Sequence, residues 1–276
     1  MTTAPTAQLA GTIGSSPGRL SLPGVLASEW TKLRSVRSTV WSLAALAVVT
    51  IGLGALISAV TNSRWRTFSF VDRLTFDPTS RSLRGVFLAQ LAIGVLGILV
   101  ITSEYGTGMI RSTLAAVPNR PVVLAAKAIV FGLVALVVSE AVTFVAFLVG
   151  QSLFTSPVPH ATLGQPGVLR AVIGSGLYLA VLGLLAMGIG SLIRHTAGAI
   201  STFVGLLLIL PLLLQAFPTS VQAALGKYLP LTIIQAMISV QPIPKTFAPW
   251  DGLLLLCGYA LVVLLAAGAL FVKRDA

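Results

Sequence analysis

Residues 83–114 read LRGVFLAQLAIGVLGILVITS followed by EYGTGMIRSTL. The first part is predominantly apolar and has the roughly 20 residues that a helix rising 1.5 Å per residue needs to cross a bilayer. The second part brings charge, glycine and hydroxyl groups together, and another apolar run, residues 124–150, follows it. The pattern predicts two membrane spans joined by a short polar segment.

Composition extends this interpretation to the whole chain of 276 residues. The hydrophobic fraction is 56%, charged residues make up 9%, and the mean hydropathy is +0.97, whereas about a quarter of the residues in soluble domains are charged. The uninterrupted apolar run at 206–214 argues against the alternating strands of a β-barrel. We expect an all-α polytopic membrane protein with six transmembrane helices, at residues 38–60, 83–103, 124–150, 168–192, 197–217 and 250–272.

The remaining composition narrows the possible partners. The net charge of +11 comes from basic residues at span ends, which favours anionic lipid headgroups over nucleic acid. Cys257 is the single cysteine and excludes an intrachain disulfide, and the sequence predicts no catalytic or metal site. Residues 1–19 lack the pattern of a signal peptide and are expected to form a disordered cytoplasmic tail ahead of a membrane domain at 20–276.

Basic residues also suggest an orientation. Lys32, Arg34 and Arg37 precede the first span and Lys273 follows the last, so the positive-inside rule places both termini in the cytoplasm. The loop at residues 61–82 is rich in arginine and would lie outside, so the overall count of basic residues gives this orientation only a slight preference.

A second helix is expected just before the first span. Apolar side chains recur there at intervals of three or four, at Leu22, Leu26, Trp30, Leu33, Val36 and Val40. This spacing predicts an amphipathic helix lying in the membrane interface, with Trp30 at headgroup depth. Glu29 falls near the apolar arc, so it is expected to pair with Lys32 or with a basic group elsewhere. A simple membrane anchor fits these residues as well as a mechanical element does.

The polar segment after residue 103 has its own predicted structure. Gly106 and Gly108 disfavour continued helix, and Thr107 can cap a short new helix that runs toward Ala116. That helix would carry Arg111 outward and use Met109, Ile110 and Leu114 for packing, which suits docking into a groove of another protein. The alternative is a solvated turn in which Glu104 and Arg111 neutralise each other.

Two further features interrupt the apolar spans. Glu140 lies inside the third span, where it could contact a transported molecule, act as a proton-linked switch, or form a buried hydrogen bond to Ser139, Thr143 or a neighbouring helix. Pro211 favours a kink in the fifth span. The stretches 221–229 and 231–240 are too short to span a membrane and are expected to form outer or re-entrant helices.

Several of these segments together resemble the permease subunits of ABC-2 type exporters, in the form common among actinobacteria. The resemblance rests on SEWTKLRSVRST at 28–39, EYGTGMIRSTL at 104–114, Leu210-Pro211 and Tyr228-Leu229-Pro230, which occur in the family's order and spacing. It implies a bacterial plasma-membrane subunit that pairs with a second copy or a paralogue. It also implies an elbow helix containing Glu29, Trp30, Lys32 and Arg34, and a coupling helix formed by Glu104, Tyr105, Gly106, Thr107, Gly108, Met109, Ile110, Arg111 and Leu114.

The expected function follows from the resemblance and from what the chain lacks. The sequence contains no P-loop motif and no acidic cluster suited to nucleotide-bound magnesium, so the chain is not expected to be an enzyme or to bind a cofactor. The resemblance implies that a separate ATP-binding subunit uses ATP and Mg²⁺ to drive export of a lipid, an antibiotic or a similar hydrophobic or amphipathic molecule. The alternatives are a non-transporting membrane scaffold, sensor or immunity factor, and an ion-coupled carrier that uses Glu140.

Overall fold

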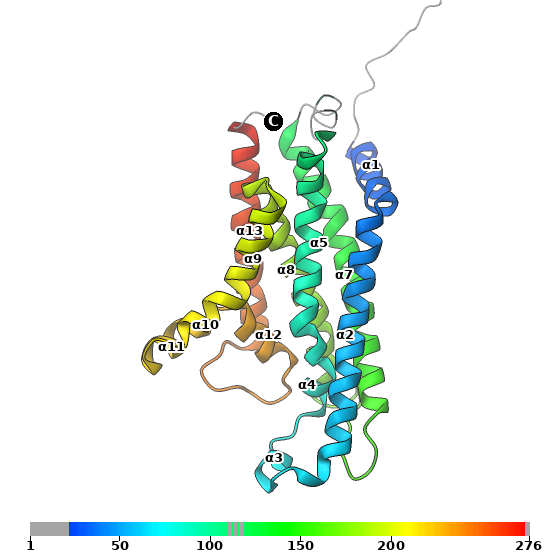
Figure 1. The fold of residues 1–276 in the computed structure, drawn as a ribbon, viewed down its shortest axis with the longest axis vertical. Coiled ribbons are helices and arrows are strands. Elements are labelled where there is room, and N and C mark those ends of the chain that lie inside the picture. The colour runs from blue at the N-terminus through cyan, green and yellow to red at the C-terminus, as the bar shows by residue number, and fades with distance from the viewer. Residues whose placement is uncertain (1–21, 110–111, 113–114, 116–118, 274–276) are drawn as a thin grey trace, which may run out of the picture.

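The computed structural model describes residues 22–109, 112, 115 and 119–273, and these residues form helices and no strands (Figure 1). Six helical stretches among them are long and apolar enough to cross a membrane. These stretches confirm the predicted all-α polytopic class and the number of spans; they are Arg37–Thr67, Pro78–Gly106, Pro121–Ser152, Val168–Ile193, Thr196–Leu214 and Pro249–Leu270.

The two ends of the bundle are formed by different helices. One end carries α1 (Leu22–Ser35), the end of α5 (Val86–Gly106), the start of α7 (Arg120–Ser152) and the end of α13 (Pro249–Lys273) (Figure 1). We call it the α1 end. The opposite end, the far end, carries the short helices α3 (Phe70–Leu74) and α4 (Pro78–Ser82). The end of α2 (Arg37–Arg64), whose start is separated from α1 by the extended residue Val36, lies there too.

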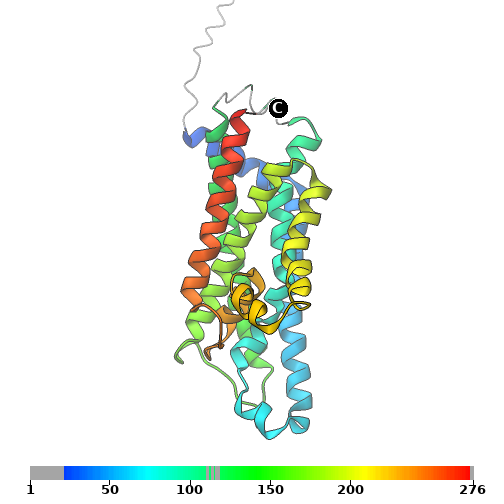
Figure 2. The same ribbon diagram turned by 90° about the vertical axis from the view of Figure 1, so that its left-hand side faces the viewer.

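Helix α8 (Val168–Ile193) forms the centre of the bundle, packed against α5, α7 and α13 (Figures 1 and 2). Its contact with α5 depends on glycine, because a Cβ atom on Gly97 would lie 2.3 Å from the backbone oxygen of Gly183. Helices in lipid associate through close packing, which small residues permit. The close approach of Gly97 and Gly183 therefore brings α5 and α8 together.

The fifth span is irregular. Helix α9 (Thr196–Val204) continues through a π-helical turn at Gly205–Ile209 into α10 (Leu210–Leu214), which contains Pro211. Proline has no N–H to donate, and single π turns commonly accommodate such a break in the hydrogen-bond ladder. The sequence predicted a kink at Pro211, and the structure places a π-helical turn directly before α10, which contains this proline.

Two short helices follow, α11 (Thr219–Gly226) and α12 (Pro230–Ile238), and they differ in burial. Helix α12 packs against α8 and α13 and has a buried face, whereas α11 projects from the bundle (Figures 1 and 2). The buried Tyr178 hydroxyl of α8 fixes the start of α12, because it bonds to the carbonyl oxygen of Pro230 at 3.1 Å and to Gln90 at 2.9 Å. Only α12 is thus built into the core.

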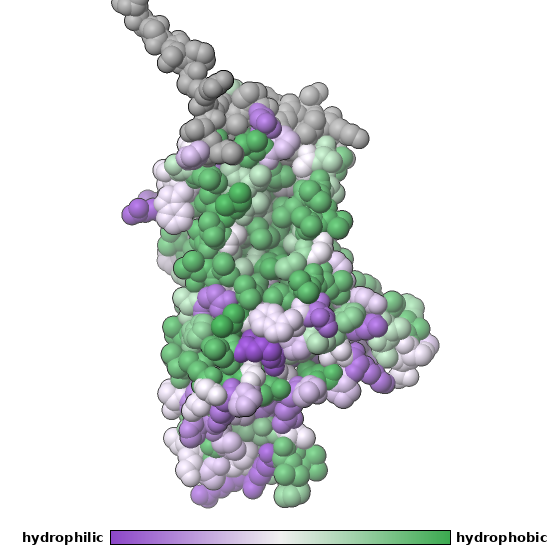
Figure 3. All heavy atoms as spheres, turned by 180° about the vertical axis from the view of Figure 1, so that it is seen from behind, coloured by the Kyte–Doolittle hydropathy of each residue, from purple (hydrophilic) through white to green (hydrophobic). Residues whose placement is uncertain are grey.

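The surface agrees with a membrane environment. Many large apolar side chains are exposed along the spans, among them Val48, Val137 and Leu254. Figure 3 shows one face of the molecule, on which hydrophobic residues cover most of the length and hydrophilic residues gather toward the far end. An exposed apolar band of this extent is typical of lipid-facing helices.

The arginine-rich loop at the far end is folded against aromatic side chains. Trp65, Phe68 and Phe76 pack together and against Phe154, which follows α7. The guanidinium of Arg73 lies 5.7 Å from the Trp65 ring centroid, and that of Arg81 lies 6.0 Å from Phe68. At least these two arginines therefore have a structural role through cation–π contacts.

Candidate functional site

Four charged side chains from three helices meet near the α1 end. The Lys127 ammonium of α7 bonds to Glu29 Oε2 of α1 at 2.5 Å and to Glu104 Oε1 of α5 at 2.8 Å. The Lys32 ammonium bonds to Glu29 Oε1 at 2.7 Å and to Glu104 Oε1 at 3.1 Å. These four residues form what we call the ion-pair cluster. It ties α1 to the two helices that enter and leave the segment at residues 107–119.

Burial makes this cluster energetically important. Glu29, Glu104 and Lys127 are only 2%, 4% and 2% exposed. Their formal charges and that of Lys32 sum to zero, and each buried charge faces an opposite one. Removing one member of a buried ion pair costs about 3–5 kcal/mol, because the partner is left buried and uncompensated. Helix α1 is therefore held by electrostatics as well as by apolar contact.

Lys32 is the more exposed cation of the cluster. Partial burial of its ammonium group acts to lower its pKa, but hydrogen bonds and charge attraction from Glu29 and Glu104 outweigh this effect and hold the pKa above its usual value. Lys32 is thus charged at neutral pH. Its stabilising pairing persists across neutral pH and would be lost only as the pH rises through that elevated pKa.

Local sequence explains how α1 presents its charge. Val25, Glu29 and Leu33 recur at intervals of four, and all three are buried on one face of the helix. Trp30 is 52% exposed, and Arg34 is also exposed. Of the predicted apolar stripe, Leu33 faces the bundle, whereas Trp30, Val36 and Val40 are exposed, and the interfacial position of the helix stays a prediction. Glu29, the residue that fitted the stripe poorly, lies at the centre of the buried face.

The predicted coupling segment begins where the glycines indicated. Helix α5 ends at Gly106, and Gly108 has a φ of +71°, in the left-handed region that glycine adopts easily. Thr107, which was predicted to cap a new helix, is instead the C-cap of α5, and its hydroxyl donates to the Ser103 backbone oxygen. Tyr105 stacks under the Arg194 guanidinium at 5.2 Å. Met109 is 44% exposed. Ile110, Arg111 and Leu114 lie outside the described residues.

Glu104 requires a correction. The sequence placed it in the segment available for docking, or in a surface pair with Arg111, but its carboxylate is buried against the two lysines of the ion-pair cluster. One of its oxygens, Oε2, is buried without a hydrogen-bond partner in the part of the chain that the structure describes. The cluster borders a cavity of about 170 Å³ that Glu104 helps to line. Glu104 thus belongs to the interior of the site.

Lys127 is the functional candidate that sequence reasoning missed. It lies seven residues beyond the start of α7, among the buried side chains Val123, Ala126 and Val130. A lysine inside an apolar run needs a partner, since an unpaired charge there is costly. Lys127 in an apolar run and Glu29 near the apolar arc each need a partner of opposite charge. This shared need was the signal in the sequence that could have predicted their pairing.

Glu140 lies away from the ion-pair cluster. It is 13 residues beyond Lys127 on α7, about 20 Å along the helix axis. Its carboxyl group packs against Gly176 of α8, where a Cβ atom would come within 2.5 Å of the Glu140 Cδ. Both carboxyl oxygens are buried without a hydrogen-bond partner among the described residues. The hydroxyl of Thr143 bonds to the Glu140 backbone oxygen and not to the carboxyl group.

Metal binding finds no support in the described part of the chain, where no three His, Cys, Asp or Glu side chains gather as ligands would.

Comparison with known proteins gives a family. No curated protein sequence matches the chain. A family model described as "ABC-2 family transporter protein" matches residues 25–211, which include the whole ion-pair cluster and the helices from most of α1 to the start of α10. The match covers well over half of the sequence, and the chain therefore belongs to the ABC-2 transporter family.

Proposed function

We propose that the chain is the permease subunit of an ABC exporter. In this proposal, the α1 end faces the cytoplasm, and a separate ATP-binding subunit docks on the segment between α5 and α7 and uses ATP and Mg²⁺. A second copy or a paralogue completes the pathway for a lipid, an antibiotic or another hydrophobic or amphipathic molecule. Family membership over residues 25–211 is the observation that carries the proposal.

The ion-pair cluster supports a route by which docking could move the bundle. Force applied to the segment at 107–119 reaches α5 and α7 at its two ends, and the cluster joins both helices to α1 within 3.1 Å. Buried, fully paired charges resist separation because each separated charge would lose its partner in a medium of low dielectric constant. We propose that α1, α5 and the start of α7 move as one unit, with α1 acting as the elbow helix.

The docking proposal is tested with Arg111→Glu in the full chain. We expect the charge reversal to abolish co-purification with the proposed ATP-binding subunit, or to remove the stimulation of its ATPase activity by the chain. Arg111→Lys should retain both, since it keeps the positive charge. Arg66→Glu reverses an exposed charge at the far end and serves as the control. Unchanged binding and ATPase activity in Arg111→Glu would contradict docking through this residue.

A substitution at Glu140 gives a second test. This test distinguishes an ATP-driven exporter from an ion-coupled carrier. Because its buried carboxyl oxygens lack partners, Glu140→Gln should leave the thermal midpoint of the purified protein unchanged or raised. We propose that the carboxyl group serves transport, so export in vesicles containing the ATP-binding subunit should fall. Export that instead proceeds without that subunit, driven by a proton gradient and lost in Glu140→Gln, would favour the carrier. Full export by the variant would remove Glu140 from the pathway.

A further inference from the structure

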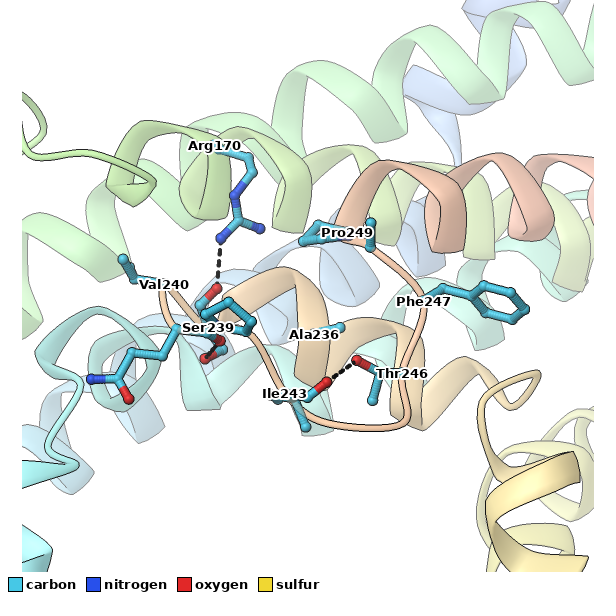
Figure 4. Close-up of a pocket in the computed structure, with 11 residues that line it drawn as sticks. Arg170, Ala236, Ser239, Val240, Ile243, Thr246, Phe247 and Pro249 are labelled. Carbon is cyan, nitrogen blue, oxygen red and sulfur yellow. Dashed lines mark hydrogen bonds between the residues drawn. The ribbon is translucent and has the colours of Figure 1, made fainter.

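A pocket of about 450 Å³ lies at the far end, between the start of α8, the end of α12 and the start of α13 (Figure 4). Arg170 of α8 points into this region, and Val240, Ile243 and Phe247 line it from the loop that joins α12 to α13, although the Phe247 ring turns away from Arg170 and packs on Tyr228. The loop is internally braced, since the Thr246 hydroxyl donates to the Ile243 backbone oxygen at 2.8 Å. The pocket therefore combines one guanidinium with an apolar lining.

Arg170 has a structural task and makes no direct ion pair, although the Asp77 carboxylate nearby attracts its charge. Its Nη2 donates to the Ser239 backbone oxygen at 2.6 Å and its Nη1 to the Met237 backbone oxygen at 3.3 Å, so it caps the last carbonyls of α12. No carboxylate lies within ion-pairing distance of it among the residues the structure describes. A guanidinium has five N–H donors, and these two contacts leave others for a ligand.

The acidic residue beside this loop does not compensate Arg170 by direct contact. The Asp77 carboxylate accepts from the backbone N–H groups of Thr79 and Ser80 with one oxygen and from that of Val240, at 2.8 Å, with the other. Arg84 lines an adjoining cavity of about 550 Å³ that shares Ser239 and Ile243 with the pocket. The segments of the far end, 61–84, 153–170 and 215–251, hold eight Lys and Arg residues but three Asp residues. The surroundings of the pocket therefore attract anions.

The position of the pocket relative to the membrane suggests which kind of anion it binds. Arg170 is two residues into the spanning part of α8, which starts at Val168, and Pro249 begins the last span. Trp250, the residue after Pro249, is 46% exposed, and exposed tryptophans at span ends are typical of headgroup depth. A group bound there would have water on one side and hydrocarbon on the other.

We infer that the pocket binds the phosphate of an anionic lipid headgroup from the leaflet at the far end. The guanidinium of Arg170 would hold the phosphate oxygens, and the pocket-lining residues Val240 and Ile243 would contact the first carbons of the acyl chains. The site is separate from the ion-pair cluster, at the opposite end of the bundle, so it does not depend on the proposed ATP-binding partner.

The test uses Gln241→Glu, because Gln241 lines the pocket, is exposed, and differs from glutamate by little more than charge. The purified full chain is reconstituted in phosphatidylcholine vesicles with and without phosphatidylglycerol, extracted, and its retained lipids are counted by native mass spectrometry. We expect the unmodified chain to retain phosphatidylglycerol preferentially and Gln241→Glu to weaken this preference about tenfold, through like-charge repulsion.

The controls separate the pocket from general surface charge. Gln222→Glu places the same charge on α11 and should keep the preference, as should the neutral Gln241→Asn. Equal loss in Gln222→Glu, or no loss in Gln241→Glu, would overturn the inference. Displacement of phosphatidylglycerol by inorganic phosphate at similar concentration would also overturn it, since the site would then recognise a free anion. Arg170→Gln is less suitable as the main variant, because it also removes the cap of α12.

Discussion

Replacing Lys127 by methionine is expected to destabilise the protein by about 3–5 kcal/mol, because two buried carboxylates lose a cation at once. Lys127 Nζ bonds both Glu29 and Glu104, and all three side chains are at least 95% buried. Methionine has a similar length, so the change removes charge with little change in volume. Thermal unfolding in detergent measures the loss, and faster tryptic cleavage after Arg34 should show that α1 has been released.

Two further variants test whether the loss of stability is specific to the ion-pair cluster. Arg66→Met removes an exposed cation at the far end and should change stability by no more than about 0.5 kcal/mol. Adding Glu104→Gln to Lys127→Met should recover part of the lost stability, because it neutralises one of the stranded carboxylates. Wild-type unfolding and cleavage in Lys127→Met would mean that the cluster does not hold α1.

The second large effect is expected at the contact between α5 and α8. Gly97→Ala would place a methyl group 2.3 Å from the Gly183 backbone oxygen, and backbone atoms cannot move aside as a side chain can. The two helices must separate, so we expect destabilisation toward the upper end of the 1–3 kcal/mol typical of overpacking. The thermal midpoint and the yield of monodisperse protein in detergent should both fall.

Gly258→Ala is the matched control for this substitution. Gly258 also lies inside a spanning helix, α13, but a Cβ atom there would meet no atom within 4 Å. Alanine is the better helix former by up to about 1 kcal/mol, so this variant should be as stable as the wild type or more stable. Equal losses in the two variants would show that glycine is needed for some reason other than the close approach at Gly183.

The sequence predicts well those features that depend on neighbouring residues. Runs of apolar side chains long enough for a bilayer gave the six spans, and Gly106 and Gly108 marked the end of α5. Glu29 was correctly identified as a residue in need of a basic partner, because its place on the helix conflicted with its charge. Each of these inferences uses only local spacing and the cost of exposing or burying a group.

Features that depend on the packing of distant segments were not predictable in the same way. Lys127 is 98 residues from Glu29, and nothing in either local pattern specifies their pairing. Glu104 was assigned to a surface because the polar residues that follow it dominate its neighbourhood in the sequence. The arginine-rich loop likewise gains its structure from Phe154, which belongs to a different part of the chain. Hydropathy predicts how deep such residues lie in the membrane, but it does not predict which residues they contact.

The order in which the chain is synthesised gives the ion-pair cluster a further consequence. Glu29 leaves the ribosome 98 residues before Lys127, a delay of about 5–20 s at common synthesis rates of about 5–20 residues per second. During that interval Glu29 has only Lys32 of the same helix as a cationic partner from the cluster. The final seating of α1 is therefore a late step of membrane insertion, which must wait until the third span has brought its lysine into place.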